Sequence, residues 1–458
     1  MAASMLFLTP ILLALSASGG MATPLGPPPG VEVRGCPREL IDRFDPGPIS
    51  VGPLHLESVA CLDFQSSPYT VTDPILSPDG AAVARWHGGA PAPVEIVEVE
   101  RPGRVDIPNQ VTFRSFAFLS GVPGAAPDAL VWSSDSQSLW SVRQELATPS
   151  GFALRGLEPI AIRRDGAVRA LPPLRHPAGP LDGLLWVGGE GRALAAFGAR
   201  GGSYRPEHED VAPTLAMVDA ARGHVLDSVP ARSVPELARR IDAHGLMVSG
   251  AAATLLPDGR IRAVIGFGRW GERLPGAGPN SEPIMHPPLW LSWTQGEAPR
   301  AWAPPYPDDR FSHMALTPDG TKLLVVRPLQ PDGIQISCRI PCRGPPPPPP
   351  TPVTGSIAEL LDFSSGRVLW RLHMRVDRFW NQDLISAVSG DGRFALIPLP
   401  HDAERKPIAL IDMASGRILQ TIKPGRVGSG RYAFGFTADG QRIWVMSGYM
   451  RFYRLGPL

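Results

Sequence analysis

Five polar side chains stand at matching distances before a recurring tight turn and could act together. They are Asp73, Asp182, His313, Asp383 and Arg431, each six or eight residues ahead of the acidic residue of its turn. Three carboxylates, an imidazole and a guanidinium form a set that can hold a metal ion or a small polar ligand. The same groups could instead hydrate a surface and pair with Arg431, which is the interpretation we favour.

The turns that would position these residues belong to a pattern that occurs seven times. An apolar stretch runs into Asp-Gly or a relative, and an alternating apolar stretch leaves it, as in ALTPDGTKLLVV from Ala315. Gly or Asp accepts the positive φ of a hairpin turn, and alternation with period two indicates a strand. The turn acids are Asp79, Asp135, Glu190, Asp258, Asp319, Asp391 and Asp439.

A second strand pair follows several of these hairpins, as in LLDFSSGRVLW from Leu360. Seven four-stranded units in a row predict an all-β, seven-bladed β-propeller, whose first strands line a central channel. The five polar residues would then meet at one mouth of that channel. Unrelated hairpins in a β-sandwich or β-solenoid are the alternative.

The beginning of the chain predicts export. Met5–Leu15 is an apolar run too short to span a bilayer but typical of a signal peptide, although no Lys or Arg precedes it. We expect a signal peptide over residues 1–22, a Pro/Gly-rich segment over 23–53 and the propeller over 54–458. His55–Phe64 alternates without a unit of its own, so we expect it to close the ring as the outer strand of the last blade.

The cysteines fit an exported protein. An even number permits two disulfides in an oxidising compartment, and the four are Cys36, Cys61, Cys338 and Cys342. Cys36 with Cys61 and Cys338 with Cys342 is one possible pairing, which the sequence alone leaves open. A zinc site is a poorer match, because no second cysteine pair or histidine stands near the CxxxC.

Two inserts have a local structure of their own. Ser233 and Glu236 fit a capping box, which predicts a short helix over Val234–Ile241. The run Pro345–Pro350 predicts an extended polyproline II loop, which could enter a partner's aromatic groove or act as a stiff spacer.

The turn sequences resemble the WD40-like, or PD40, propeller repeats of periplasmic proteins of the TolB type and of prolyl-oligopeptidase-type peptidases. Ser77–Gly80, Thr317–Gly320 and Thr437–Gly440 carry this resemblance, and Leu361–Trp370 is similar to quinoprotein repeats. The resemblance covers about Val71–Leu458. It implies a propeller and leaves the function open, because this superfamily contains scaffolds, receptors and enzymes.

The catalytic motifs of the enzymes among these families do not match. The nearest approach to the peptidase motif GxSxG is Gly428-Ser429-Gly430, with Arg426 in place of the leading glycine. Quinoprotein dehydrogenases have eight blades and usually an adjacent cysteine pair, whereas this chain has seven units and no adjacent cysteines. No HExxH, P-loop or EF-hand loop occurs either, so we expect no cofactor.

The overall charge limits the partners. Lys and Arg number 44 and Asp and Glu 43, a formal net charge of +1 that offers no basic excess for a phosphate backbone. We therefore expect a periplasmic or secreted monomer without a transmembrane segment, which binds a protein or a small polar ligand, but not nucleic acid, through one face. The alternative is a metal-assisted hydrolase or lyase that uses the five polar residues.

Overall fold

The computed structural model describes residues 30–34, 36, 38, 52–62, 75–86, 94–99, 104–107, 130–146, 154–198, 213–244, 247–268, 288–304, 313–327, 353–376, 386–400, 407–423, 433–447 and 449–456. The predicted signal peptide, the proline run Pro345–Pro350, Cys338 and Cys342 lie outside these residues.

The described strands form seven sheets, of which six have four strands and one has five. In each four-stranded sheet the strands follow one another in chain order, and each pairs antiparallel with the next. We number these sheets, or blades, from the one that begins with β3. This succession of simple antiparallel sheets is what the repeated hairpins predict.

The first three blades contain the following strands. Blade one holds β3 (Ile75–Leu76), β4 (Ala82–Trp86), β5 (Val94–Glu98) and β6 (Arg104–Ile107). Blade two holds β7 (Leu130–Trp132), β8 (Ser138–Leu146), β9 (Leu154–Arg163) and β10 (Val168–Ala170). Blade three holds β11 (Leu181–Val187), β12 (Arg192–Phe197), β13 (Thr214–Asp219) and β14 (His224–Pro230).

The remaining blades continue in the same way. Blade four holds β15 (Met247–Leu255), β16 (Ile261–Gly268), β17 (Leu289–Thr294) and β18 (Arg300–Trp302). Blade five holds β19 (His313–Leu316), β20 (Lys322–Val326), β21 (Val353–Asp362) and β22 (Val368–Val376). Blade six holds β23 (Ala387–Val388), β24 (Phe394–Pro398), β25 (Ile408–Asp412) and β26 (Ile418–Ile422). Blade seven holds β27 (Ala433–Phe436), β28 (Arg442–Ser447) and β29 (Tyr449–Leu455), joined by two strands from the N-terminal side.

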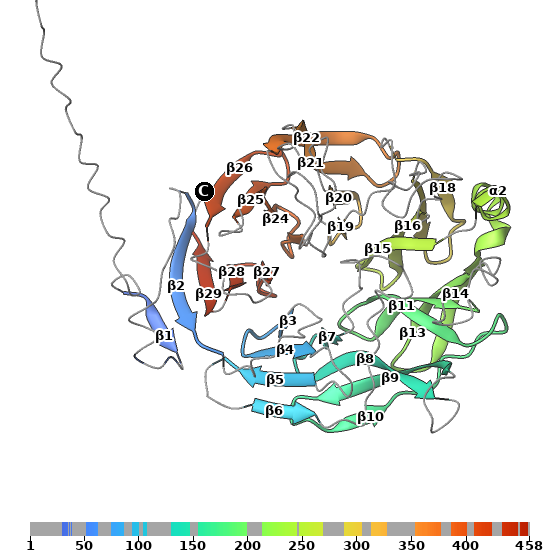
Figure 1. Ribbon diagram of the computed structural model, residues 1–458, viewed down its shortest axis with the longest axis horizontal. Helices are drawn as coiled ribbons and strands as arrows, with labels where there is room; N and C mark the ends of the chain where they lie inside the picture. The colour runs from blue at the N-terminus through green and yellow to red at the C-terminus, as the bar shows by residue number, and fades with distance from the viewer. Residues whose placement is uncertain are drawn as a thin grey trace, which may run out of the picture.

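The seven blades stand around a common centre, with their first strands innermost (Figure 1). The first strands of consecutive blades contact one another in the pairs β3 and β7, β11 and β15, β15 and β19, β19 and β23, and β23 and β27. The predicted all-β fold with seven blades is confirmed.

The turn between the first and second strands has the same hydrogen bond in every blade. In blade one the Gly80 N–H donates to the Ser77 carbonyl over 2.8 Å, and the equivalent bond closes the other six turns. Asp79 Oδ1 also accepts the Ala81 N–H at 3.0 Å. Gly80 has a φ of +74°, a conformation that glycine adopts without strain. The predicted capping role of the turn acid is thus confirmed in this turn.

All of these turns lie on one side of the ring. Because neighbouring strands run in opposite directions, the first-to-second and third-to-fourth turns of a blade share one edge of its sheet. We call this side the tight-turn face, defined by residues 77–81, 133–137, 188–191, 256–260, 317–321, 389–393 and 437–441 together with the third-to-fourth turns of blades two to six.

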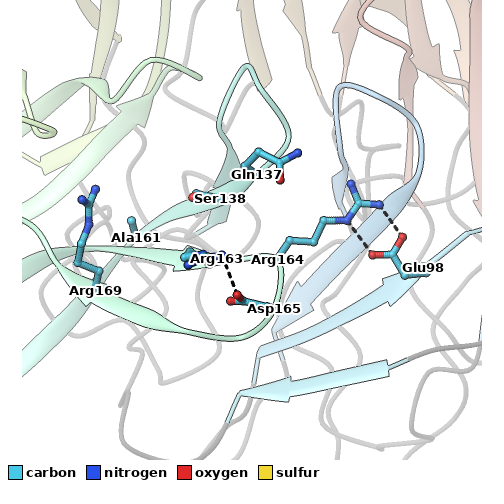
Figure 2. A pocket seen from close by; sticks show the side chains of 8 residues that line it. All are labelled: Glu98, Gln137, Ser138, Ala161, Arg163, Arg164, Asp165 and Arg169. Carbon is cyan, nitrogen blue, oxygen red and sulfur yellow. Dashed lines mark hydrogen bonds and ion pairs between the residues drawn. The ribbon is translucent and has the colours of Figure 1, made fainter.

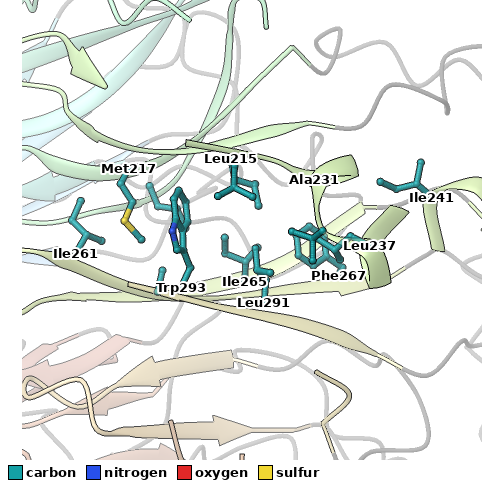
Figure 3. Close-up of a cluster of buried hydrophobic side chains, with 14 residues drawn as sticks. Leu215, Met217, Ala231, Leu237, Ile241, Ile261, Ile265, Phe267, Leu291 and Trp293 are labelled. Atoms are coloured by element: carbon teal, nitrogen blue, oxygen red, sulfur yellow. The ribbon is translucent and has the colours of Figure 1, made fainter. Parts of the chain in front are cut away.

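Apolar side chains fill the spaces between neighbouring blades. Between blades three and four, Leu215 and Met217 pack with Ile265, Leu291 and Trp293, whose indole is 1% exposed (Figure 3). Burying a large apolar side chain stabilises a fold by about 1.5–3 kcal/mol, so these contacts hold the blades in fixed positions.

The short helix predicted over Val234–Ile241 is present, but it starts one residue later and ends three residues later than predicted. A 3-10 turn, η3 (Ala231–Ser233), precedes α2 (Pro235–His244). The Ser233 hydroxyl donates to the Pro230 carbonyl at 2.7 Å, so the expected capping box does not form. Leu237 and Ile241 of α2 pack into the cluster between blades three and four. Within the described ranges no helix has the length and apolar character needed to cross a membrane.

Two N-terminal strands extend blade seven. β2 (Leu54–Ala60) pairs antiparallel with β29, and β1 (Glu32–Arg34) pairs parallel with β2. A disulfide between Cys36 and Cys61 links the ends of these two strands. This disulfide belongs to the possible pairing of Cys36 with Cys61 and Cys338 with Cys342.

Candidate functional site

The structure describes one complete side chain among the five predicted channel residues. Asp73, Asp383 and Arg431 lie outside the described residues, and for Asp182 only the backbone within β11 is described. The convergence of the five groups therefore stays a prediction.

His313 joins two neighbouring inner strands. It begins β19 of blade five, and its Nδ1 lies 2.8 Å from the hydroxyl of Ser386, the residue before β23 of blade six. Desolvation by the surrounding protein lowers the pKa of His313 to about 4, so the imidazole is neutral at pH 7. A neutral imidazole against a hydroxyl can accept a proton, but a working nucleophile–base pair also needs a group that orients the imidazole. Among the described residues, no hydrogen bond to Nε2 supplies that group.

Several turn acids accept hydrogen bonds within their own turns. In blade two, hydrogen bonds from the Ser133 hydroxyl and the Gln137 N–H lower the pKa of Asp135. In blade seven, Thr437 lowers the pKa of Asp439 in the same way, at an oxygen–oxygen distance of 2.5 Å. These carboxylates are charged at neutral pH and act as hydrogen-bond acceptors for the backbone.

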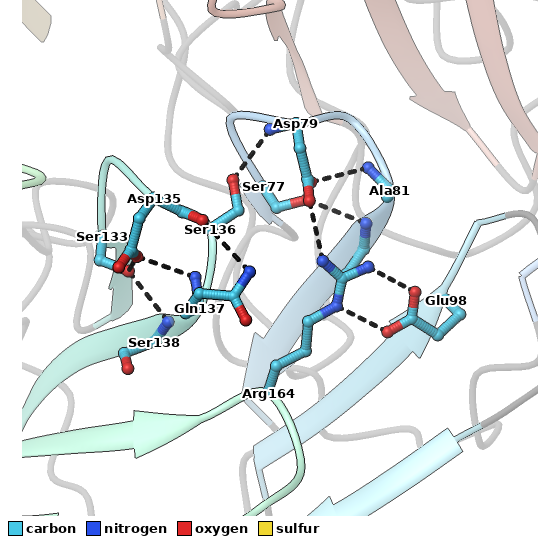
Figure 4. A network of polar contacts seen from close by, with 11 residues as sticks. Ser77, Asp79, Ala81, Glu98, Ser133, Asp135, Ser136, Gln137, Ser138 and Arg164 are labelled. Atoms are coloured by element: carbon cyan, nitrogen blue, oxygen red, sulfur yellow. Dashed lines mark hydrogen bonds and ion pairs between the residues drawn. The ribbon is translucent and has the colours of Figure 1, made fainter.

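One arginine on the tight-turn face ties blade two to blade one (Figure 4). Arg164 follows β9, and its Nε and one terminal nitrogen donate to the two carboxylate oxygens of Glu98 at 2.7 and 2.5 Å. Its other terminal nitrogen donates to Asp79 Oδ2 at 2.8 Å. The Glu98 carboxylate, and then that of Asp79, raise the pKa of Arg164 above its usual value. Because a forked guanidinium–carboxylate contact fixes both partners, this joint is rigid.

A second contact reinforces the same joint. The Asp79 N–H donates to the Ser136 hydroxyl of blade two at 2.9 Å. Ser136 has a φ of +61° and is 2% exposed. A non-glycine residue in this conformation is strained unless its surroundings hold it there, and the bond to Asp79 helps to do so.

A hollow of about 810 Å³ lies beside this joint (Figure 2). Its lining side chains are Glu98, Gln137, Ser138, Ala161, Arg163, Arg164, Asp165 and Arg169. Figure 2 shows Arg169 at one end and the Arg164–Glu98 pair at the other. Arg163 forms an exposed ion pair with Asp165 at 2.9 Å. Arg169 is exposed, and its side chain makes no hydrogen bond or ion pair with another residue that the structure describes.

This hollow is suited to recognising charge. Its lining contains three arginines and two acids, and Arg164 is already neutralised by Glu98 and Asp79. Arg169 is thus the cation available to a carboxylate or another anion. Within the described part of the chain, no three His, Cys, Asp or Glu side chains are grouped closely enough to hold a metal ion.

Sequence reasoning did not find the hollow. Arg163 and Arg164 precede Asp165-Gly166 in a third-to-fourth turn, and two adjacent arginines in such a turn are the signal that could have pointed to it. That signal does not identify Glu98 or Asp79 as partners, since both belong to the preceding blade.

Comparisons with known proteins find similar solved structures but no family. No protein-family model matches the chain, and no curated protein matches it in sequence. It is similar to the solved structure of U3-55K, at 10% identity over 85% of this chain and 97% of that one, with a TM-score of 0.45. For the RRP9 WD40 repeats the values are 9% identity, 89% and 100% coverage and 0.45, and for the Dos1 propeller 11% identity, 87% and 96% coverage and 0.42. Likeness at this level carries no statement about function, and the seven-bladed fold stands on the strand pairings of the chain itself.

Proposed function

We propose that this protein is a non-catalytic scaffold that recognises a partner protein or a small polar ligand through its tight-turn face. The observation that carries the proposal is the hollow beside the joint between blades one and two. It combines a cation held in place, Arg164, with an exposed cation available for binding, Arg169. A site that is ordered before binding loses little conformational entropy when the partner arrives.

The surrounding fold supports a binding role. The turn acids and Arg164 are used to hold turns and blades together, and the blades are fixed by apolar packing. Rigid scaffolds with variable surface groups are a common setting for recognition. The catalytic alternative is not carried forward, because no hydrogen bond from another described residue orients Nε2 of His313, the one described side chain among its five residues.

We also propose that the protein is exported and monomeric, that its repeats are of the PD40 type, and that an N-terminal strand closes its ring. The disulfide between Cys36 and Cys61 supports export, because disulfides persist in oxidising compartments. The pairing of β2 with β29 supports closure of the ring by an N-terminal strand. Removal of residues 1–22 would give a mature chain that begins before β1.

The binding proposal is tested by comparing two charge reversals. Arg169→Glu should reduce capture of the partner from the native envelope or secreted fraction, because it places a second anion beside Asp165 in the hollow. Arg417→Glu is the matched control, since Arg417 is an exposed arginine in a third-to-fourth turn of blade six. Equal capture by the two variants would refute the hollow as the binding position.

Export and closure have separate tests. Mass spectrometry of exported material should show an N-terminus close to residue 23, and an intact Met1 would contradict export. Deleting His55–Phe64 should destabilise the entire ring, because it removes β2 and exposes the edge of β29. An unchanged melting temperature after this deletion would contradict closure.

A further inference from the structure

The outermost strand of blade five, β22, is long and regularly exposed. β22 has 9 residues, whereas β10 and β18 have 3, β6 has 4, β26 has 5 and β14 has 7. It stands at the end of its sheet and pairs with β21 on its inner side. Leu369, Arg371, His373 and Arg375 alternate along it as exposed residues. β22 therefore presents a strand edge long enough to pair with another strand.

The other row of β22 side chains fixes the strand in place. Trp370, Leu372 and Met374 pack against the cluster between blades five and six, which includes Leu324 and Ala395. The Trp370 indole N–H donates to the carbonyl of Met413 in blade six at 2.9 Å. The exposed edge is thus held in an extended conformation, and a segment that pairs with it needs no rearrangement of the scaffold.

The exposed row carries basic side chains and no acidic one. Arg371 forms an ion pair with the buried carboxylate of Glu359 at 3.2 Å, yet 43% of its side chain stays exposed. Two residues further along the strand are His373 and then Arg375, both exposed. If two copies of β22 paired antiparallel about His373, Arg371 of each would face Arg375 of the other, and like charges opposite each other are destabilising. The charge pattern disfavours a second copy and favours an acidic strand.

The chain itself provides an example of such an addition. Blade seven receives β1 as a fifth strand on the outside of β2, with Glu32 opposite Ser58 and Arg34 opposite Ala60. The outer edge of a blade in this ring can therefore accept an additional strand.

We propose that β22 is a docking strand for an extended acidic segment of a partner protein. The segment would pair with the outer edge of β22 as a fifth strand of blade five, and place carboxylates along Arg371, His373 and Arg375. Main-chain hydrogen bonds provide affinity in this mode, and alternate side chains provide specificity. The inference rests on the proposed scaffold function, but it uses a surface separate from the hollow at Arg169.

The test uses defined peptides and the full mature chain. A fluorescent peptide of 9 residues, the length of β22, in which Glu alternates with Thr, should bind, and the same peptide with Lys in place of Glu should not. Two further acidic peptides carry N-methyl groups on odd or on even residues. A strand points alternate N–H groups to opposite sides, so one methylated peptide should bind and the other should not. Equal binding by both, or by neither, would overturn strand pairing.

Charge reversal on β22 checks the position. The double variant His373→Glu, Arg375→Glu should weaken binding of the acidic peptide about tenfold and strengthen binding of the Lys peptide, as expected for cross-strand charge pairs. Arg371 stays unchanged because it neutralises Glu359. The gain for the Lys peptide shows that the variant is folded. Arg239→Glu, an exposed charge reversed on α2, is the control and should leave both affinities unchanged.

The remaining outcomes are also decisive. Failure of the acidic peptide to bind the wild-type protein overturns the proposal. In that case another part of the chain or a second copy covers β22, and the molar mass from light scattering distinguishes the two. If partner capture depends on Arg169 while the peptides do not bind, the docking strand is wrong and the hollow stands. If peptides bind β22 while capture ignores Arg169, the hollow is wrong and the docking strand stands.

Discussion

Gln420 ties the N-terminal strand β2 to blade six, and its replacement tests how much that joint contributes to stability. Gln420 lies in β26 and is 2% exposed. Its Oε1 accepts the Leu54 N–H at 2.6 Å, and its Nε2 donates to the Leu54 carbonyl at 3.2 Å. Leu54 is itself 2% exposed, so water cannot replace this amide without opening the structure.

The expected magnitude follows from these two bonds. Gln420→Met keeps the length of the side chain and removes both bonds, which leaves a buried N–H and a buried carbonyl of Leu54 without that partner. An unsatisfied buried polar group costs about 1–3 kcal/mol, so for two such groups we expect a loss of about 2–6 kcal/mol. Gln420→Glu keeps the acceptor for the N–H and, when ionised, turns an anionic oxygen toward the Leu54 carbonyl. Burial raises the pKa of such a carboxyl group, so its stability deficit should shrink as pH falls and the acid becomes protonated.

The assay combines equilibrium unfolding in urea with amide hydrogen exchange. Gln420→Met should lower the free energy of unfolding and raise exchange at the Leu54 amide and along β2. Gln441→Met is the matched control, because Gln441 is exposed and it is its backbone N–H that bonds to Asp439. If both variants have the same stability and the Leu54 amide stays protected in both, the argument that this joint holds β2 is wrong.

Three further predictions concern two turns and the N-terminal disulfide. Hydrogen bonds from two serines lower the pKa of Asp362 from 3.8 to about 2. The stabilisation that the carboxylate provides is therefore complete above pH 4 and lost as pH falls toward 2. In acid unfolding experiments, Asp362→Asn should flatten the pH dependence of the free energy of unfolding in this window. Gly416→Ala should destabilise the protein by about 1–3 kcal/mol, because φ is +72° and the new Cβ would lie 2.7 Å from the Trp370 ring, whereas Gly440→Ala, with φ +67° and open space, should cost less in thermal unfolding. Cys61→Ser removes a crosslink between residues 25 apart, which is worth about 3 kcal/mol in the loop-entropy treatment. The variant should raise amide exchange in β1 while the other strands of the seven sheets stay protected. Unchanged exchange in β1 would contradict a stabilising role of the disulfide for this strand.

The features predicted well from sequence are local ones. The turn at Asp319-Gly320 is encoded within a few residues, since the hydroxyl of Thr317 bonds to Asp319 and the glycine adopts a φ of +68°. The same chemistry at seven places gives the number of blades. Helix α2 was predicted for the same reason, but its start was not, because the Ser233 hydroxyl bonds backward to Pro230 and the chain forms a 3-10 turn first.

The joint at Arg164 could not be predicted because its partners are distant in the chain. Glu98 is 66 residues away and Asp79 is 85 residues away, and both belong to the preceding blade. Which arginine of a turn reaches the neighbouring blade depends on the twist of two sheets and on their packing. The alternation of apolar and polar residues along a strand gives no information about either. The pairing of β2 with β29 could be predicted from the sequence for a different reason. One predicted strand belonged to no repeat unit, and the last blade lacked a fourth strand.

Repetition separates the groups that build this protein from those available for recognition. A group present in most blades, such as the turn acid bonded to a Ser or Thr hydroxyl, serves the blade itself, because the same need recurs in each. A binding surface for one partner must instead depart from the repeat. Arg169 departs from it as an exposed cation in the hollow, and β22 does so by its length and its exposed basic side chains. Neither departure is needed to close a turn or fill a core, so selection for stability alone leaves both unexplained. Reversing charge at Arg169 or on β22 should therefore affect binding while thermal stability stays near that of the wild-type protein, and a large loss of stability in either variant would assign these groups to the fold instead.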